Sequence, residues 1–353
     1  MNRFESARRA ALRVGACRAW GAWLAAGASG GAEAAPAGAA APSPESAADP
    51  SRAAAQCVIP AKAGGGFELT CGLARDALQS VRPQAPPLTA RYLPGGIGAL
   101  AFDRIATGQT GGDGTLVAFS SGSLLNMAQG RFGPHGTSSV HWLAALGADY
   151  GVVAVTQQSP YRNLQDLLLA LRQDMGRVVF GAGGTVGSQD WVKAALLVRA
   201  AGRDHKAMRF VSFEGGGEAL VALRGGHVGV FTGDAAEALG SAGAPVRYLA
   251  VLADARLPGA LARAPTAREQ GVDLVWRTVR GLYLSAQVSR EATDAWRRAF
   301  DEALRSPHYP ALLARHGLHP FSLTGAALDR FVDGALADYR LLATELGLPT
   351  WRR

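Results

Sequence analysis

One stretch decides the fold, CVIPAKAGGGFELTC at residues 57–71. Its first residues are apolar and partly β-branched, which predicts a strand over 56–59. Three glycines then free the backbone, and residues 67–80 follow with the apolar periodicity of a helix. A glycine turn between a strand and a helix is typical of α/β folds with mostly parallel sheets.

The same alternation repeats along the chain. Because 353 residues exceed what one hydrophobic core usually organises, the repetition predicts two αβ lobes. Apolar runs at 142–147, 152–156 and 277–284 lead between two sets of elements. The other predicted strands are 88–92, 115–119, 178–181, 209–213, 228–232 and 247–253, and the other predicted helices are 97–107, 163–172, 188–201, 218–224, 291–305 and a last helix that Thr324 can cap.

Apolar stripes at helical spacing predict which residues form the core. In each stripe the side chains recur on one helix face, the pattern of a helix packed against a sheet. The stripes are Trp191, Ala195 and Val198; Trp296, Phe300 and Leu304; and Phe331, Val332, Leu336 and Tyr339.

Glycine-rich turns between strand and helix are the candidate functional feature. They lie at 60–68, 93–98, 181–188 and 214–217, and a serine-rich turn with Ser120 and Ser121 follows another strand. Each turn exposes backbone N–H groups at a positive helix end, which suits a carboxylate or a phosphate. Open α/β sheets bind ligands at the carboxyl ends of their strands, where all these turns should meet. Lys62 can add a mobile cation to the first turn.

Other chemistry has little support in the sequence. A P-loop is absent, and the dinucleotide fingerprint that Gly181 and Gly183 begin has Val186 where the third glycine should stand. Glu214 ends the next strand as a ribose-binding acid would, but it lies about ten residues farther from the glycine motif than in the dinucleotide fingerprint. A nucleotide enzyme therefore stays open only as an alternative. No protease, CxxC or GxSxG motif occurs and the seven histidines are scattered, so we expect no catalytic residue, metal or cofactor.

The N-terminal residues predict export. Arginines precede a short apolar stretch and an Ala-rich run, which indicates a signal peptide over 1–40, and the Ser/Pro/Ala-rich residues 41–55 predict a disordered spacer. A disordered cytoplasmic tail is the alternative. In an oxidising compartment Cys57 and Cys71 are disulfide candidates, with two buried thiols as the alternative. The net charge of +8 is spread along the chain, which favours anionic ligands and argues against nucleic acid.

Several motifs together resemble one known family. The opening stretch is followed in order by YLPGGIGA at 92–99, GAGGTVGS at 181–188, GGGEAL at 215–220 with LRGGHV at 223–228, and APT at 264–266 with EQG at 269–271. This series closely resembles the solute-binding receptors of tripartite tricarboxylate transporters, the Bug family, and is most similar to their tricarboxylate-binding branch.

The resemblance implies a type II periplasmic-binding-protein fold, with a ligand cleft between two lobes and two crossovers. We expect lobe 1 at 56–156 and 277–353, lobe 2 at 157–276, and a monomer. Typical members have an apolar, proline-rich sequence around position 62, so Lys62 indicates a ligand with extra negative charge. The implied ligand-binding residues are Lys62, Gly64, Gly65, Gly66, Phe67, Ser120, Ser121, Thr185, Gly187, Ser188, Asp234 and Arg280.

The expected function is that of a periplasmic receptor without catalysis. It would bind citrate or a related di- or tricarboxylate and deliver it to the membrane subunits of a tripartite transporter. The alternatives are a cytoplasmic nucleotide-dependent enzyme and an extracytoplasmic sensing subunit that docks on a sensor kinase.

Overall fold

The stretch at residues 57–71 forms the predicted strand–turn–helix unit. In the computed structural model, which describes residues 49–240, 243 and 245–350, strand β1 is Gln56–Ile59 and helix α2 is Gly66–Val81. A disulfide joins Cys57 to Cys71 with 5.7 Å between their Cα atoms, as predicted. The disulfide ties the strand to the helix and closes the glycine turn between them.

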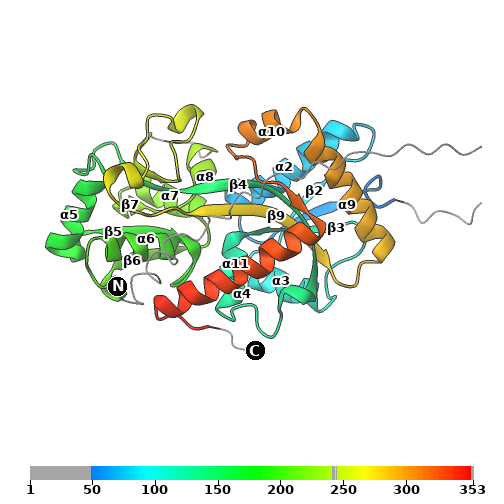
Figure 1. Ribbon diagram of the computed structural model, residues 1–353, viewed down its shortest axis with the longest axis horizontal. Helices are drawn as coiled ribbons and strands as arrows, with labels where there is room; N and C mark the ends of the chain where they lie inside the picture. Colours follow the sequence, from blue (N-terminus) through cyan, green and yellow to red (C-terminus); the bar gives the residue numbers. More distant parts are fainter. Residues whose placement is uncertain (1–48, 241–242, 244, 351–353) are drawn as a thin grey trace, which may run out of the picture.

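Two αβ lobes lie side by side, as the sequence predicts (Figure 1). Within the described residues, one mixed ten-stranded sheet passes through both lobes in the order β2-β1-β3-β9-β4-β7-β5-β6, and β8 and β10 also pair with β4. The first lobe has parallel β1, β2 and β3, and the second has parallel β5, β6 and β7. The strands are β2 (Thr89–Tyr92), β3 (Thr115–Ser120), β4 (Val140–Thr156), β5 (Val179–Gly183), β6 (Arg209–Phe213), β7 (Val230–Phe231), β8 (Val246–Leu252), β9 (Arg277–Ser285) and β10 (Leu323–Thr324).

Helices cover the strands, and three of these helices were not predicted from the sequence. α4 begins with the serine-rich turn, α8 is very short, and α10 begins with a proline in its first turn, so none has a long apolar period. The helices after α2 are α3 (Ala99–Ala106), α4 (Ser121–Ala128), α5 (Leu164–Asp174), α6 (Gln189–Ala200), α7 (Gly216–Arg224), α8 (Ala235–Gly240), α9 (Arg290–Arg305), α10 (Tyr309–Arg315) and α11 (Gly325–Glu345).

The two apolar runs at 142–147 and 152–156 are one strand rather than two. β4 pairs with β9 through Tyr150 in the first lobe and with β8 from Gly151 onward in the second. The sequence did not indicate this continuity, because Asp149 and Gly151 interrupt the apolar run. We therefore propose that the lobes divide within β4 rather than after residue 156.

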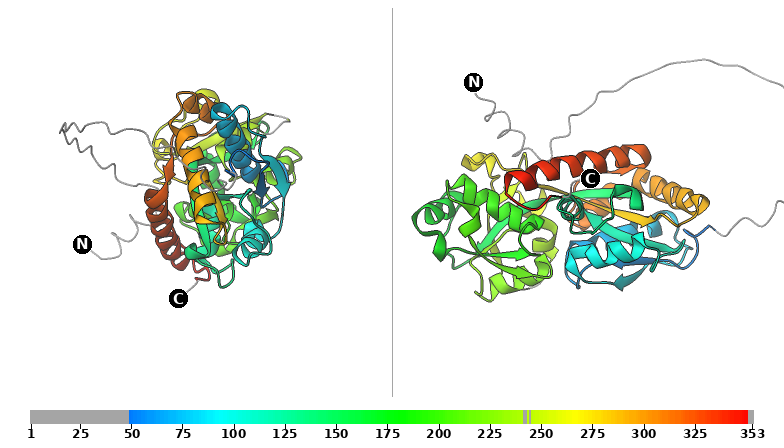
Figure 2. Two further views of the ribbon diagram at one scale, coloured as in Figure 1. Left: turned by 90° about the vertical axis from the view of Figure 1, so that its right-hand side faces the viewer. Right: turned by 90° about the horizontal axis from the view of Figure 1, so that it is seen from below.

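The chain returns to the first lobe next to this crossing. The Trp276 N–H donates to the Leu252 carbonyl, and the Gly151 N–H donates to the Trp276 carbonyl. Helix α11 then extends along both lobes (Figure 2), and Glu345 near its end pairs with Arg199 of α6 at 2.7 Å. The lobes are thus connected at one side by strands and by a long helix.

Most of the predicted core residues are buried. The Trp191, Trp296 and Leu336 stripes pack as expected, while Leu304 and Phe331 are only partly buried, which corrects the prediction for these two residues. Within the described chain, the helices are too short or too polar to cross a membrane.

The predicted signal peptide at 1–40 lies outside the described residues, as does the first part of the predicted spacer. The rest of that spacer, residues 49–55, makes contacts with the first lobe, and its disorder stays a prediction. The Asp49 carboxylate lies 3.8 Å from the Arg82 guanidinium, and the Thr89 N–H donates to the Ala55 carbonyl.

Candidate functional site

Four helices begin at one cavity between the lobes. The first turns of α2 and α4 come from the first lobe, and those of α6 and α7 come from the second. The glycine-rich turns of the sequence therefore converge, as the strand order predicts. The cavity has a volume of about 60 Å³ and is open to solvent on one side. Since a helix start has N–H groups without an acceptor in the helix itself and a partial positive charge, the cavity suits an anionic group.

The start of α2 meets the second lobe directly. The Gly66 N–H donates to the Glu237 carboxylate at 2.5 Å, and Glu237 belongs to α8. A Cβ atom at Gly66 would collide with the Arg280 guanidinium, so a larger residue would have to displace Arg280 from its buried ion pairs. The first turn of α7 packs equally closely, because a Cβ atom at Gly217 would lie 2.5 Å from the Gly64 carbonyl oxygen.

Further contacts join the lobes at the edge of the cavity. Arg131 of the first lobe donates to the Thr185 hydroxyl at 2.8 Å and also to the Val186 carbonyl. Gln129 donates to the Gly187 carbonyl at 2.8 Å. The lobes are therefore in contact across the cavity, as expected for a closed cleft.

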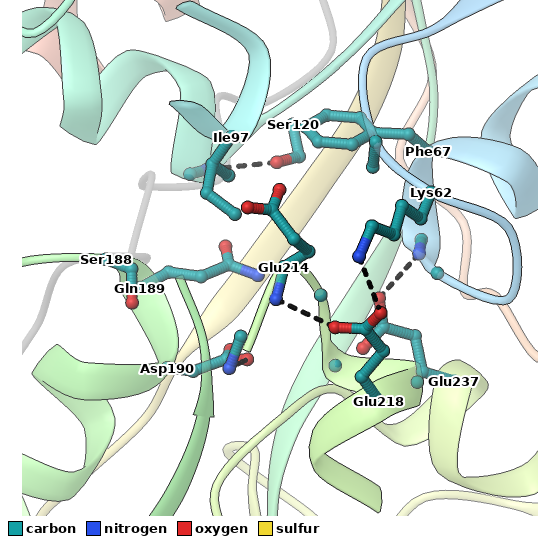
Figure 3. Close-up of a pocket in the computed structure, with 18 of the residues that line it drawn as sticks. Lys62, Phe67, Ile97, Ser120, Ser188, Gln189, Asp190, Glu214, Glu218 and Glu237 are labelled. Atoms are coloured by element: carbon teal, nitrogen blue, oxygen red, sulfur yellow. Dashed lines mark hydrogen bonds and ion pairs between the residues drawn. The ribbon is translucent and has the colours of Figure 1, made fainter. Parts of the chain in front are cut away.

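Lys62 is part of the same closure. Its Nζ atom lies 3.1 Å from Glu218 Oε1 on the opposite wall, and both side chains are substantially exposed (Figure 3). The Glu214 N–H and the Lys62 ammonium together lower the pKa of Glu218. The positive charge of Lys62 is thus balanced by Glu218.

A buried charge network supports the cavity from behind. Arg280 Nη2 lies 2.7 Å from Asp149 and 3.0 Å from Asp234, and Lys193 Nζ lies 2.7 Å from Asp234 and 2.8 Å from Asp190. Arg280 is 2% exposed, and Asp149, Asp234 and Lys193 are fully buried. Arg280 enters the cavity wall from β9, the strand that returns from the second lobe.

Burial and neighbouring charges shift the pKa values of the carboxyl groups in this network in different directions. Burial raises the pKa of Asp149 and of Asp190. Burial also opposes ionisation of Asp234, but the charges of Lys193 and Arg280 lower its pKa. Burial and the nearby Asp234 charge raise the pKa of Glu237 to about 8. The network holds more acidic groups than cations, and the pKa values of Asp149, Asp190 and Glu237 are all raised.

The structure brings some of the predicted site residues to the cavity and leaves others behind its wall. Lys62, Gly65, Gly66, Phe67, Ser120, Ser188 and Arg280 line the cavity. The predicted residues outside the cavity lining are Gly64, Ser121, Thr185, Gly187 and Asp234. Ser121 accepts a hydrogen bond from the Val279 N–H, and Asp234 lies behind Arg280. The other three make contacts between the lobes. Ligand contact stays a prediction for both sets.

Several residues of the wall were not predicted. Gln189 and Asp190 follow the predicted Ser188 in the first turn of α6, so the turn itself pointed to them. No sequence pattern pointed to Glu237, because helix α8 is too short to show a helical periodicity of apolar residues. The polar wall residues that were not among the predicted ligand-binding residues are Asn126, Gln189, Asp190, Glu214, Glu218 and Glu237. Among the described residues no group of three or more His, Cys, Asp or Glu side chains could hold a metal ion.

Comparisons with known proteins agree with this geometry. The family model described as "Tripartite tricarboxylate transporter family receptor" matches residues 95–348. No curated protein matches the sequence.

Three solved structures illustrate the likeness in fold. A Rhodopseudomonas palustris protein with adipate is 19% identical with a TM-score of 0.73, and it aligns over 84% of this chain and 98% of its own. The Rhodopseudomonas palustris protein MatC with malate is 20% identical with a TM-score of 0.68, over 82% and 98%. A TctC solute-binding protein from Polaromonas, without ligand, is 22% identical with a TM-score of 0.57, over 83% and 98%.

Proposed function

The chain belongs to the tripartite tricarboxylate transporter receptor family, and from this premise we propose that it is a periplasmic receptor for a small organic carboxylate. It holds the acid between its lobes and passes it to the membrane subunits of a tripartite transporter. No chemical step is part of this function.

One observation carries the proposal, the convergence of four helix starts on a single cavity. Two come from each lobe, so a carboxylate bound there contacts both lobes and favours their closed arrangement. A membrane partner can then distinguish the closed, ligand-bound receptor from the empty one.

The finer prediction of a citrate-like ligand rests on the resemblance to the tricarboxylate-binding branch and on the charge of Lys62. The ion pair between Lys62 and Glu218 weakens the second argument, because it balances the charge that was to attract an additional carboxylate. Adipate and malate, found in the two solved structures with ligand, widen the range of acids to test.

Calorimetry on the purified chain tests the proposal. We expect at least one acid among citrate, malate, adipate, succinate and glutamate to bind saturably and to raise the melting temperature. Ser188→Ala should weaken that binding by about tenfold or more, since it removes a hydroxyl from the wall. Absence of heat and of any thermal shift with every acid would refute the carboxylate-receptor function.

The two alternatives differ in their support. A nucleotide enzyme is disfavoured because Gly181 and Gly183 lie within β5 instead of forming a phosphate-binding turn, and the Gly183 N–H already donates to Asp190 at 3.0 Å. A sensing subunit would use the same cavity and differ only in its partner. Co-purification with transporter membrane subunits, rather than with a sensor kinase, would favour the transport role.

A further inference from the structure

The cavity wall carries more acidic than basic side chains. Lys62 is balanced by Glu218, and Arg280 is balanced by Asp149 and Asp234. Within the described chain, no lysine or arginine forms an ion pair with the remaining carboxylates, those of Glu214 and Glu237. The charged residues of the wall are Lys62, Asp190, Glu214, Glu218, Glu237 and Arg280.

Glu237 occupies a position that a ligand carboxylate would otherwise take. It accepts from the Gly66 N–H at the start of α2, and a Cβ atom at Gly216, at the start of α7, would collide with its carboxylate. One anion-binding position between these two helix starts is therefore filled by the chain itself. A ligand with two or three carboxylates would have to compete with Glu237 or be buried beside it.

Two buried amide oxygens of the cavity lack a hydrogen-bond donor. Gln189 Nε2 donates to Asp234 at 3.0 Å, and since a carboxylate only accepts, the Gln189 oxygen must face away from Asp234. Asn126 Nδ2 approaches the Ile97 carbonyl at 3.4 Å, which fixes the Asn126 amide in the same way. Both oxygens are buried without a partner in the described chain, and Asn126 is 2% exposed.

Glu214 adds a charge to the same part of the cavity. Its side chain extends from the end of β6 toward Ile97 and Ser120 of the other lobe (Figure 3). Among the described residues, no hydrogen bond or ion pair engages its carboxylate. Glu214, Gln189 and Asn126 all line the cavity. Glu214 is exposed, whereas the amide oxygens of Gln189 and Asn126 are buried without a donor, which is unfavourable.

A protonated amine would satisfy these acceptors. An ammonium group has three N–H donors and no acceptor, and its hydrogen bonds to charged and amide oxygens are strong. An additional carboxylate has only acceptors, so it would leave the same oxygens unpaired and add repulsion. The serine hydroxyls and the free N–H groups of the helix starts remain for one carboxylate of the ligand.

We propose that the ligand is a small carboxylate that also carries a protonated amine, with the ammonium group bound by the oxygens of Asn126, Gln189 and Glu214. This inference rests on the carboxylate-receptor function and narrows its ligand class. It selects amine-bearing acids over citrate and other acids with carboxylates alone.

Matched pairs of acids test the inference. We would measure succinate against aspartate, glutarate against glutamate, and butyrate against 4-aminobutyrate by calorimetry on the purified chain at pH 7. In at least one pair the amine-bearing member should bind about tenfold tighter or more, about 1.4 kcal/mol. If the amine-free member binds as tightly in every pair, or if only amine-free acids bind, the inference is wrong and the carboxylate-receptor function stands. If no acid binds, the receptor function itself fails.

A variant separates recognition from a general effect on the protein. Glu214→Gln keeps the shape of the side chain and removes its charge, so the preference for the amine-bearing member should fall about tenfold while the amine-free member binds no more weakly. Glu291→Gln, on α9 outside the cavity wall, should change neither affinity. Equal losses for both members in Glu214→Gln would contradict an ammonium site at Glu214.

Discussion

The carboxylate of Glu237 accepts a 2.5 Å hydrogen bond from the backbone N–H of Gly66 in the opposite lobe. The Arg280 guanidinium occupies the space that a side chain at position 66 would need. The first turn of α2 therefore receives an acceptor from the chain itself when the lobes are together. This contact links closure of the cleft to the ionisation of one side chain.

The free energy of unfolding should depend on pH through Glu237. Burial and Asp234 raise its pKa to about 8 from an ordinary value of 4.5. The unfolded chain loses this proton near pH 4.5 and the folded chain near pH 8, so rising pH destabilises the folded state between these values. Glu237→Gln keeps an acceptor for Gly66 and removes the titration. Relative to wild type, it should gain about 2 kcal/mol or more in urea unfolding between pH 5 and pH 8.

Glu218→Gln is the matched control for this prediction. Its pKa is lowered by the Glu214 N–H and by Lys62, so ionisation of Glu218 stabilises the folded state and is lost only in acid. The replacement should therefore never become more favourable as pH rises from 5 to 8. A Glu237→Gln curve parallel to wild type over this range would show that Glu237 titrates normally.

Arg280 should be essential for stability in addition to any role in ligand binding. It is buried and pairs with both Asp149 and Asp234, so Arg280→Met leaves two buried carboxylates without their cation. Breaking such a buried pair costs about 3–5 kcal/mol, which urea unfolding would measure. Arg290→Met, which removes an arginine whose side chain is 91% exposed, should change stability by less than about 0.5 kcal/mol. Similar stability of the two variants would contradict the role of the buried network.

The disulfide should stabilise the first lobe. Cys57 and Cys71 are 14 residues apart, and closing a loop of this size is worth about 3 kcal/mol in the chain-entropy model. The double replacement Cys57→Ala and Cys71→Ala should lose about this free energy of unfolding. Reducing agent should destabilise the wild type similarly and leave the double variant unchanged. Equal stability with and without reductant would mean that the bond contributes nothing.

The sequence predicted the parts of the site that depend on local signals. The turn after β1 was predictable because apolar strand residues, three glycines and a helical period follow one another within one short stretch. Parallel strand order then places Ser120, Ser188 and the Gly215–Gly217 turn at the same edge. These inferences require only neighbouring residues and the general behaviour of parallel sheets.

Contacts between distant residues could not be predicted in this way. Arg280 was a candidate, but its partner Asp149 lies 131 positions earlier in a strand that reads as interrupted. Glu237 is 171 positions from Gly66 and belongs to a helix without a period. The charge balance of the cavity depends on these pairings, so the sequence suggested extra positive charge at Lys62 where the folded chain has paired charges and unpaired carboxylates.

The pH dependence of ligand binding should distinguish the two ligand classes. The charged groups facing Glu237 are Asp149, Asp190, Asp234 and Arg280, and its pKa of about 8 means that it becomes negative between about pH 7 and pH 9. A negative Glu237 attracts an ammonium group and repels a carboxylate. Affinity for an amine-bearing acid such as glutamate should therefore rise from pH 6.5 to 8.5, while affinity for glutarate should fall.

Calorimetry between pH 6.5 and pH 8.5 would measure both trends. We expect each affinity to change by about threefold to tenfold. Binding of the amine-bearing acid should also release protons, because the ammonium group favours the ionised form of Glu237. In Glu237→Gln both slopes should flatten, since the titrating group is gone while the acceptor for Gly66 remains. If glutamate and glutarate respond to pH with the same sign in the wild type, the charge of Glu237 does not act on the amine, and the acceptors of the cavity serve another donor.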